Sequence, residues 1–569
     1  MLARKRTLTL ITAFAMLSIP WLAPEASALP HPDGDHYQYY FLSTDGITNL
    51  HADVLRPKGL PNYVRTPVIL TVSPYTNHNG ATTDTDLNGV GPSPRFYDFL
   101  GLSQALRRGY TYVMVDLPGF GGSGGCNDWG GVREQGAVKA AVEWAASRPW
   151  SNGKVALLGK SYDGWTGLMG IAQQPRGLSA VVSLEPVYDG YRYIWMNGIR
   201  RSSTVGTITL FQAIDAKPGR PNDDPEYLAN SGPNVWCYPV NIVGAGFDDN
   251  ANGPFWQERN LIPTTAGKTT PIFLTQGFLE TNTHPDGAFQ YWNGLAGNEN
   301  RAWFGQFDHC RGWETEGACT LTNNPRLAVG REGFITEVMS FLDEHLKGIQ
   351  PQVDYPTVAV QDILGRYRAE ADWPPVDSIM HETSLNIGSY TDSGSGSGLR
   401  PTETQGIWSV SQPLPHDVWL SGEPVVTVEV NSLLPNANMA ANVYDIGPDG
   451  RILMISRGVN LLRGMGTRGF TFSLYGHDFP IPAGHRIGVL IGSGNTDVFT
   501  HVPTNQSVSV LSASVRLPFL TYNRTSFLDG GSTPRLERYL AATRNTLSAA
   551  KITSSERTFN IPGPLLPPP

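Results

Sequence analysis

Two patterns of hydrophobic positions divide this chain. Up to about residue 376, short apolar runs alternate with stretches of helical periodicity, and beyond it short alternating segments are separated by turn residues. Alternation of strands and helices is typical of a mostly parallel sheet with helices on both faces. Many short strands with turn signals favour a β-sandwich or jelly roll. We therefore predict an α/β domain followed by an all-β domain.

The first pattern predicts a series of strands and helices. Two strands joined by a turn are expected over residues 36–56, followed by apolar strands at 68–72, 110–115, 155–158, 180–184 and 272–274. Helical patterns lie between them, chiefly at 132–147 and directly after Ser161. A further helix over 331–347 is expected to close this domain.

The strand and helix alternation is interrupted over residues 187–267, where aromatic, proline and acidic residues replace it. An insertion of this size between two core strands is expected to form a cap over the carboxyl edge of the sheet, where ligands bind. We place the α/β domain at 29–376, with this cap inserted, and the β-sandwich or jelly-roll domain at 377–569. The proline-rich tail 562–569 is expected to be disordered.

The composition and the N-terminal residues indicate in which compartment the protein is expected. With 569 residues, 40% of them apolar and 16% charged, the chain is expected to be a soluble protein of two or three domains. Residues 1–28 have a basic start, an apolar stretch and a small-residue cleavage site, which predicts a secretory signal peptide. A membrane anchor is the alternative, disfavoured by Pro20 and by the short apolar stretch. No other segment is long and apolar enough to cross a membrane.

The charge balance and the cysteines agree with secretion. Loss of residues 1–28 moves the balance from 42 basic against 50 acidic residues to 39 against 49, so nothing favours nucleic-acid binding. The four cysteines are even in number, and of the three possible pairings we favour Cys126 with Cys237 and Cys310 with Cys319. No spacing typical of metal ligands occurs, so neither a metal nor another cofactor is expected.

The chemistry centres on residues 154–164, KVALLGKSYDG. A buried strand, a sharp turn carrying Ser161 and a following helix would lift this hydroxyl above the sheet edge, as in the nucleophile elbow of α/β-hydrolases. Gly159 leaves room for the turn, and Gly164 allows the helix to pack close to the strand. Asp163 occupies the position at which the commoner G-x-S-x-G motif has its second glycine. An incidental serine in a glycine-rich connection is the alternative.

A serine nucleophile needs a base and an orienting acid, which follow it in this fold in the order acid, then histidine. His309, directly after a strand expected to end near Phe307, is the best candidate for the base, and His284 is its competitor. Glu280 follows the preceding strand and is the candidate acid. The weaker candidates for this acid are Asp286 and Asp308.

The oxyanion of the reaction needs two hydrogen-bond donors that are already in place. One should be the backbone N–H of Tyr162, the residue after the nucleophile. The second normally comes from the loop after an early core strand, here residues 73–77, and the Tyr75 phenol is positioned to supply it.

Four features together resemble the X-Pro dipeptidyl-peptidase and cocaine-esterase family of serine hydrolases: residues 73–75 (SPY), 119–124 (GFGGSG), 159–164 (GKSYDG) and the C-terminal β domain. The resemblance implies Ser161 as nucleophile, Tyr75 and Tyr162 as oxyanion hole, His309 as base and a helical cap over the site. The acid departs from the family pattern, because Glu280 stands where an aspartate three residues after a glycine is usual.

The resemblance implies a secreted serine hydrolase that acts on small peptides, amides or esters through an acyl-enzyme. An X-Pro dipeptidyl-peptidase-like activity is the first hypothesis, and an esterase or acylase of the same family is the alternative, favoured by the short N-terminal region. A dipeptidyl-peptidase would need a cap carboxylate for the substrate ammonium. The acids available there are Asp215, Asp223, Asp224, Glu226, Asp248 and Asp249. A non-catalytic carbohydrate-binding or adhesion protein on the same scaffold is a more distant alternative.

Overall fold

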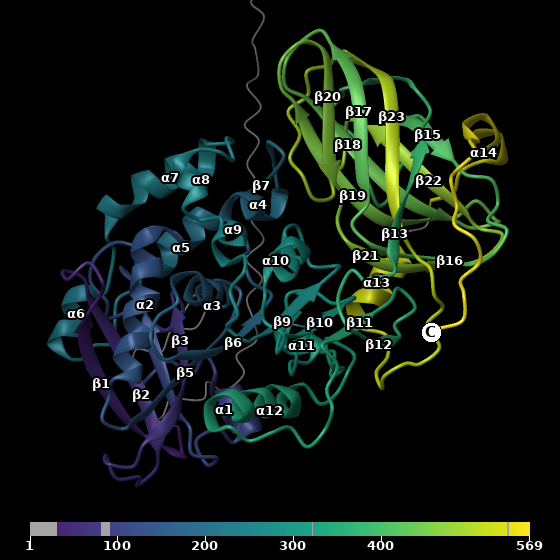
Figure 1. Ribbon diagram of the computed structural model, residues 1–569. Helices are drawn as coiled ribbons and strands as arrows, with labels where there is room; N and C mark the ends of the chain where they lie inside the picture. Colours follow the sequence, from purple (N-terminus) through teal and green to yellow (C-terminus); the bar gives the residue numbers. More distant parts are fainter. Residues whose placement is uncertain (1–30, 81–90, 321, 543–544, 569) are drawn as a thin grey trace, which may run out of the picture.

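The computed structural model describes residues 31–80, 91–320, 322–542 and 545–568, so the predicted signal peptide at 1–28 lies outside the described residues. A ten-stranded sheet in the order β1-β2-β4-β3-β5-β6-β9-β10-β11-β12 forms the first part of the molecule (Figure 1). Its strands are β1 (Gly34–Leu42), β2 (Asn49–Pro57), β3 (Thr66–Ser73), β4 (Thr111–Asp116), β5 (Ser151–Lys160), β6 (Leu178–Leu184), β9 (Ile272–Gly277), β10 (Arg301–Gly305), β11 (Val358–Gln361) and β12 (Tyr367–Glu370).

The centre of this sheet is parallel and its edges are antiparallel. The seven central strands, β4, β3, β5, β6, β9, β10 and β11, run parallel to one another. At the two ends of the sheet, β1 and β2 and the strand β12 pair antiparallel with their neighbours. Side chains alternate between two cores, since Val68, Leu70 and Val72 of β3 point to one face and Ile69 to the other. The predicted strands are confirmed, but β11 and β12 were not anticipated, and they extend the sheet beyond the helix expected to close it.

Helices cover both faces, as predicted. Helices α2 (Val132–Ala146) and α3 (Tyr162–Gln173) share the core on one face, and α1 (Tyr97–Ser103) and α12 (Phe334–Lys347) share the core on the other. Helix α12 begins three residues later than the pattern 331–347 suggested, after Gly333, whose φ of 87° ends the preceding turn. Helices α10 (Ala288–Gly294) and α11 (Glu316–Thr320) lie in the connections around β10.

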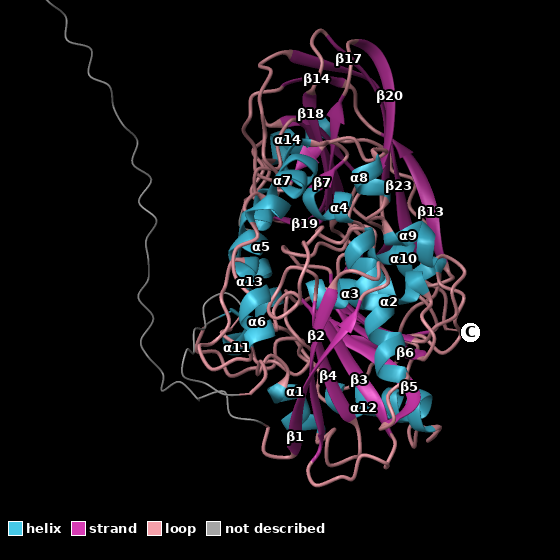
Figure 2. Cartoon of the chain, turned by 90° about the vertical axis from the view of Figure 1, so that its left-hand side faces the viewer, coloured by secondary structure: helices cyan, strands magenta, loops and turns pink. Residues whose placement is uncertain are grey.

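The segment between β6 and β9 forms a mainly helical cap, and Figure 2 shows its helices α5 and α7 on the side of the sheet that also carries the β-sandwich. A disulfide bond joins Cys237 in the cap to Cys126 in the loop after β4. The elements of the cap are α4 (Gly190–Ile194), β7 (Trp195–Met196), β8 (Ile199–Arg200), η1 (Ser202–Thr204), α5 (Thr207–Asp215), α6 (Pro225–Asn230), η2 (Val235–Cys237), α7 (Tyr238–Phe247), α8 (Pro254–Gln257) and α9 (Leu261–Thr265).

The C-terminal part is all-β except for two short helices, and its two sheets enclose one apolar core. One sheet contains β13 (Ser378–Ser384), β14 (Gly388–Thr391), β16 (Val418–Gly422), β17 (Val425–Ser432), β20 (Gly466–Ser473), β21 (His477–Ile481) and β23 (Ser507–Leu520). The other contains β15 (Gly406–Val410), β18 (Ala437–Ile446), β19 (Ile452–Leu462) and β22 (Arg486–Gly492). Helices α13 (Pro534–Ala542) and α14 (Ala549–Ser555) follow.

The structure agrees with one further expectation, the cysteine pairing, and contradicts another, the disorder of the tail. Cys310 pairs with Cys319, so both favoured cysteine pairings are present. The expected disorder of the tail is wrong for residues 562–568, because the backbone of Leu566 exchanges hydrogen bonds with Thr521 and Asn523 next to the end of β23. Within the described parts of the chain, no helix has the length and apolar character needed to span a bilayer.

Candidate active site

Ser161 lies at the sharp junction between β5 and α3. Its backbone has φ 67° and ψ −122°, a conformation that side-chain-bearing residues rarely adopt. A Cβ on Gly159 would lie 2.3 Å from the backbone of Asp163, and one on Gly164 would lie 2.9 Å from the carbonyl oxygen of Leu184. Gly159 is therefore required by the tight turn and Gly164 by the close packing of α3 on β6, and the strand-turn-helix has the shape of a nucleophile elbow.

Glu280 and His309 are hydrogen-bonded to each other. Glu280 Oε2 lies 2.8 Å from His309 Nδ1, with the carboxylate buried and the imidazole 17% exposed. Burial alone would raise the pKa of Glu280, but the His309 imidazole, the backbone N–H of Asn282 and the Lys160 ammonium together lower it. The carboxylate is thus ionised at neutral pH and engages Nδ1, which leaves Nε2 of His309 as the ring nitrogen available to a nucleophile.

The competing candidates have other partners. His284 is buried, its Nε2 lies 3.3 Å from Ser203 Oγ, and burial together with nearby Arg201 and Arg457 lowers its pKa well below the usual value. Asp286 forms ion pairs with Arg192 and Arg201. Asp308 forms an ion pair with Arg535, whose Nε lies 3.3 Å from Asp308 Oδ2. Within the described residues, none of these three groups forms the acid-histidine pair that Glu280 and His309 form.

A pocket of about 530 Å³ opens in front of Ser161, and the candidate oxyanion donors Tyr75 and Tyr162 line it too. Thr283, on the loop after Glu280, also lines this pocket, and its Oγ1 lies 3.3 Å from His309 Nδ1. Ser161, Tyr75 and Tyr162 thus line one pocket, and the Glu280-His309 pair lies outside its lining, connected to it through Thr283.

The two tyrosines offer different groups to the pocket. The Tyr162 hydroxyl donates to Glu134 Oε2 at 2.7 Å, so only its backbone N–H is available next to Ser161. Burial raises the pKa of the Tyr75 phenol, against the effects of the Arg95 guanidinium and of a hydrogen bond to the Ser161 side chain. Tyr75 is therefore a protonated donor at neutral pH, beside the serine hydroxyl.

Asp163 has a partner that the sequence did not reveal. Its carboxylate, 1% exposed, lies 2.5 Å from Arg95 Nε, and the Arg95 guanidinium stacks on the Tyr75 ring at 4.1 Å from the centroid. The carboxylate at the position of the usual second glycine thus holds a cation against the candidate oxyanion donor. The identity of Asp163 was noticed in the sequence, but nothing there linked it to Arg95.

Glu185 is a second residue that sequence reasoning missed. It directly follows β6, has φ 45° and is buried beside Glu280. It accepts a hydrogen bond from the Gly277 N–H at 3.1 Å, while burial and the neighbouring charge of Glu280 raise its pKa well above the usual value. Burial and the charge of Glu280 therefore favour the neutral form of Glu185, which shares a hydrogen bond with Glu280. Its place directly after a core strand was the available signal.

The pocket in front of Ser161 is uncharged. Its described lining contains no Asp, Glu, Lys or Arg and consists of Tyr75, Trp129, Ser161, Tyr162, Trp165, Val187, Tyr193, Ser203, Gly206, Thr207, Leu210, Phe211, Thr281, Asn282 and Thr283. None of the six cap acids is in this lining. Asp215 pairs with Asn127 and Asp223 with His78, for example. The lining offers aromatic surface and hydroxyl groups instead.

Two protein-family models match the chain. The model described as X-Pro dipeptidyl-peptidase (S15 family) matches residues 45–311. The model described as the X-Pro dipeptidyl-peptidase C-terminal non-catalytic domain matches residues 245–534, which is half of the chain.

Curated relatives carry both peptidase and esterase names. A Streptomyces avermitilis protein provisionally named Xaa-Pro dipeptidyl-peptidase is 26% identical over 460 residues, which is 71% of this chain but 63% of that protein, less than two thirds of its length. A Bacillus cereus protein of the same provisional name is 22% identical over 82% of this chain and 86% of its own length. The cocaine esterase of a Rhodococcus species is 20% identical over 70% of this chain and 78% of its own length.

Solved structures share the fold. An α-amino acid ester hydrolase superposes with a TM-score of 0.63 at 16% identity, over 90% of this chain and 100% of that one. A Staphylococcus aureus hydrolase described as a member of the CocE/NonD family gives a TM-score of 0.63 at 16% identity, over 85% of this chain and 93% of its own. At these identities the likeness shows the α/β-hydrolase fold alone.

Proposed function

Because this chain belongs to the X-Pro dipeptidyl-peptidase and cocaine-esterase family, we propose that it is a serine hydrolase that forms an acyl-enzyme on Ser161. The observation that supports this most is the hydrogen bond of 2.8 Å between Glu280 and His309, in contact with Thr283, which lines the same pocket as Ser161. An imidazole oriented in this way, near a serine on a strained turn, suits general-base activation of that hydroxyl.

In the proposed reaction, Ser161 Oγ attacks the carbonyl carbon of the substrate while His309 Nε2 takes the serine proton. The Tyr162 N–H and the Tyr75 phenol donate to the oxygen that becomes negatively charged. The protonated His309 then passes its proton to the leaving amine or alcohol. Water, deprotonated by His309, attacks the acyl-enzyme, and the carboxylic acid leaves as Ser161 is regenerated.

For the substrate, the pocket favours an ester or amide with a neutral, apolar acyl group. A buried ammonium needs an anionic or aromatic partner to offset its lost hydration, and no carboxylate lies in the described lining. Aromatic walls such as Phe211 and Trp165 suit an apolar or aromatic acyl group of moderate size, since the volume is about 530 Å³.

A second candidate activity is that of an X-Pro dipeptidyl-peptidase. The match of the peptidase model over residues 45–311 favours it, as do the provisional names of the bacterial relatives. The ammonium of such a substrate would then be held by aromatic rings or by a side chain outside the described lining. Tyr193 and Trp129, which stack with centroids 6.2 Å apart, are the rings in the pocket best placed for this.

A comparison of three substrates separates the two candidates. The wild-type enzyme is assayed with an Ala-Pro chromogenic amide, with its N-acetylated form and with an aryl ester of a neutral acid. We expect efficient ester hydrolysis and an amide activity that does not depend on a free amine. A kcat/KM for the free-amine dipeptide that exceeds both others by more than about 100-fold would establish the dipeptidyl-peptidase instead.

We also propose that the protein is exported. Its two disulfide bonds suit an oxidising compartment, and the sequence of residues 1–28 has the pattern of a cleavable signal. Expression of the full chain in a secreting host, with mass analysis of the mature N-terminus, tests this. Cleavage after Ala28 is expected, and retention of the intact N-terminus on the membrane would favour an anchor.

A further inference from the structure

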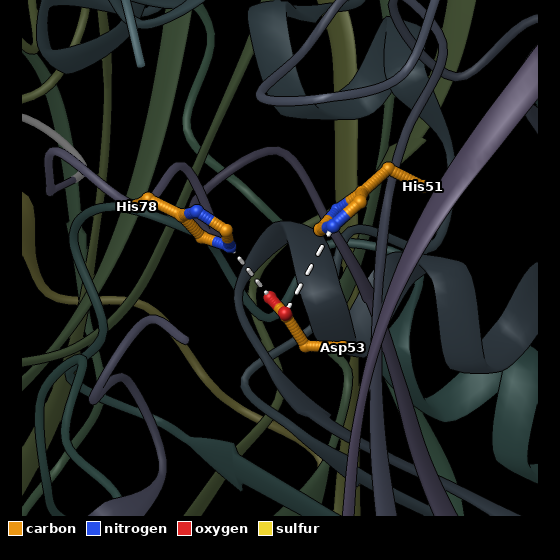
Figure 3. Close-up of side chains that lie close together, drawn as sticks. All are labelled: His51, Asp53 and His78. Carbon is orange, nitrogen blue, oxygen red and sulfur yellow. Dashed lines mark hydrogen bonds and ion pairs between the residues drawn. The ribbon is translucent and has the colours of Figure 1, made fainter. Parts of the chain in front are cut away.

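A second buried cluster of histidine and aspartate side chains lies around strand β2, outside the pocket (Figure 3). His51 and Asp53 are two residues apart on β2 and therefore share one face of the sheet. His78 reaches them from the loop after β3, three residues beyond Tyr75. Each of the three residues is 1% exposed, and their nitrogen and oxygen ligand atoms all lie within 4.8 Å of one another.

Both imidazoles are oriented by a second carboxylate. His51 Nδ1 lies 2.9 Å from Asp116 Oδ2, and His78 Nδ1 lies 2.7 Å from Asp223 Oδ1. The Nε2 atoms consequently turn toward the same carboxylate, that of Asp53. Histidines that bind metals nearly always donate the other ring N–H to a carboxylate or carbonyl in this way, because the bond fixes both tautomer and ring orientation.

One nitrogen in the cluster has no hydrogen-bond partner. His51 Nε2 is buried and unpaired within the described residues, and its nearest acidic atom is Asp53 Oδ1 at 3.9 Å. A neutral imidazole that donates from Nδ1 carries a lone pair on Nε2. The Tyr227 ring contacts both imidazoles. It stacks on the His78 ring with centroids 4.1 Å apart and lies edge-on to the His51 ring with centroids 4.8 Å apart.

We propose that His51 Nε2, His78 Nε2 and the Asp53 carboxylate form a binding site for Zn²⁺ or a similar divalent transition-metal ion. Two imidazoles and one carboxylate are a donor set that suits zinc. Four ligands at about 2.0–2.2 Å in a tetrahedron lie roughly 3.3–3.6 Å apart. The separations found are 3.0 Å from His78 Nε2 to Asp53 Oδ2 and 3.9 Å from His51 Nε2 to Asp53 Oδ1, so the side chains would have to adjust to bring one carboxylate oxygen and both nitrogens to that spacing.

His36 is the candidate fourth ligand and marks the route by which an ion enters. Its Nε2 lies 2.7 Å from Asp53 Oδ1, and its side chain is 15% exposed, in contrast to the other members of the cluster. A small movement of this ring toward the ion would complete the site, with a water molecule as the alternative ligand. Two buried carboxylates, Asp53 and Asp116, and the half-buried Asp223 converge here, so a divalent cation also offsets their charge.

The site joins three parts of the catalytic unit. His51 and Asp53 belong to the sheet, His78 to the loop that carries Tyr75, and the orienting Asp223 to the cap just before α6. A bound ion would therefore hold the loop and the cap against the sheet edge, and it would have a structural role. The sequence contains no contiguous motif for this site, because its ligands come from separate segments. The pairing of β2, β4 and β3 brings these segments together.

The other group of potential ligands in the described chain, Cys310, Glu316 and Cys319, does not compete for the same metal. Both of its sulfur atoms are in a disulfide bond, and a metal needs the thiolate. Binding experiments are therefore carried out on oxidised protein, without a histidine affinity tag.

The test is a metal titration of the full chain after treatment with a chelator. Added Co²⁺ is expected to give the visible absorption bands of a four-coordinate ion, saturating at one equivalent, and Zn²⁺ is expected to displace it. Zinc should also raise the Tm in a concentration-dependent manner. Absence of these bands, together with a Tm that does not respond to zinc, overturns the proposal and leaves the cluster as a buried charge network only.

Variants locate the site. We expect His51→Gln to abolish saturable binding, and Asp116→Asn to weaken it about 10–100-fold through the orientation of His51. The matched control is His485→Gln, which removes a histidine paired with an aspartate, Asp445, in the β-sandwich and should leave binding unchanged. Equal affinity in wild type and in folded His51→Gln would contradict the assignment. If His51→Gln fails to fold, the titration of the wild type decides by itself.

Discussion

At the scale of single residues, the candidate site depends on which carboxyl groups are charged. The His309 imidazole lowers the pKa of Glu280 against the effect of burial, whereas burial and the charge of Glu280 raise the pKa of the fully buried Glu185 beside it. Two glutamates that share a hydrogen bond are stable when only one of them is ionised. The arrangement places the negative charge on the group that faces the imidazole.

This assignment predicts unequal effects of two substitutions at position 185. Glu185→Gln keeps the shape and a hydrogen-bond donor without charge, so kcat should stay within about threefold of wild type, since the wild-type group is neutral too. Glu185→Ala leaves the Gly277 N–H without a partner and removes one hydrogen bond from Glu280, which costs about 1–3 kcal/mol and should lower kcat and Tm together. Similar losses in both variants would mean that Glu185 is ionised in the native enzyme.

The phenol of Tyr75 gives a second prediction at this scale. Tyr75→Phe removes one donor to the oxyanion and keeps the ring under Arg95, so Tm should change little while kcat falls about 100–1000-fold. Steady-state kinetics on an aryl ester, with the melting temperature measured in parallel, checks this. As a control, Tyr193→Phe removes another hydroxyl from the same pocket and should affect KM more than kcat. An unchanged kcat in Tyr75→Phe would remove this residue from the oxyanion hole.

At the scale of elements, the parallel strands and their helices could be predicted because each strand alternates between two cores and so reads as a continuous apolar run. The elbow could be predicted because close contacts require glycine at 159 and 164 on either side of Ser161. Strands β11 and β12 were missed because each has only four residues. The partners of Asp163 and Glu185 could not be found, because burial and a neighbour distant in sequence define them. The residue assignments of the catalytic site and the domain boundary at 376 stay predictions.

Helix α5 of the cap gives a prediction about pH. Asp215 at its end is 1% exposed, and burial raises its pKa to about 7, with Asn127 as its hydrogen-bond partner. Because the folded state then holds this proton more tightly than the unfolded chain, the contribution is fully present below about pH 4 and is lost as the pH rises toward 7.

Thermal unfolding at pH 5 and at pH 8 measures this effect. The Asp215→Asn side chain stays neutral at both pH values. We therefore expect the Tm of this variant to fall less than that of wild type between pH 5 and pH 8, and the variant to be more stable than wild type at pH 8. The control Asp224→Asn changes an acid on the neighbouring helix α6 that is more exposed, and no such gain at pH 8 is expected there. Parallel pH profiles of wild type and Asp215→Asn would show that this carboxyl ionises freely.

At the scale of the whole molecule, the β-sandwich is fixed to the α/β part by a buried ion pair. Arg368 on β12 donates two hydrogen bonds of 2.7 Å to Asp478 on β21, and Trp419 and Ser421 of β16 donate to the same carboxylate. Figure 1 shows β12 and β21 at the junction of the two parts. The loop after β9, which carries Glu280, has a contact of its own with the C-terminal part, since Arg535 of α13 donates to the carbonyl oxygen of Leu279.

Loss of one partner of this pair should therefore destabilise the whole chain. Asp478→Ala leaves the buried Arg368 guanidinium with Glu370 as its remaining acidic partner, and we expect a loss of about 3 kcal/mol in the free energy of unfolding, the lower end for a broken buried pair. Glu537→Ala serves as the control, because its ion pair with Arg326 also joins the two parts but is half exposed and should contribute less than about 1 kcal/mol. Equal losses in urea denaturation would show that burial of the first pair has no special effect.

The reaction of Ser161 with a fluorophosphonate tests the central proposal most directly. We expect one adduct per chain by intact mass, located on the peptide that contains Ser161, and a labelling rate reduced at least about 100-fold in His309→Gln. An inert wild-type enzyme, or an adduct on any other residue, would contradict the proposal that this serine is the activated nucleophile.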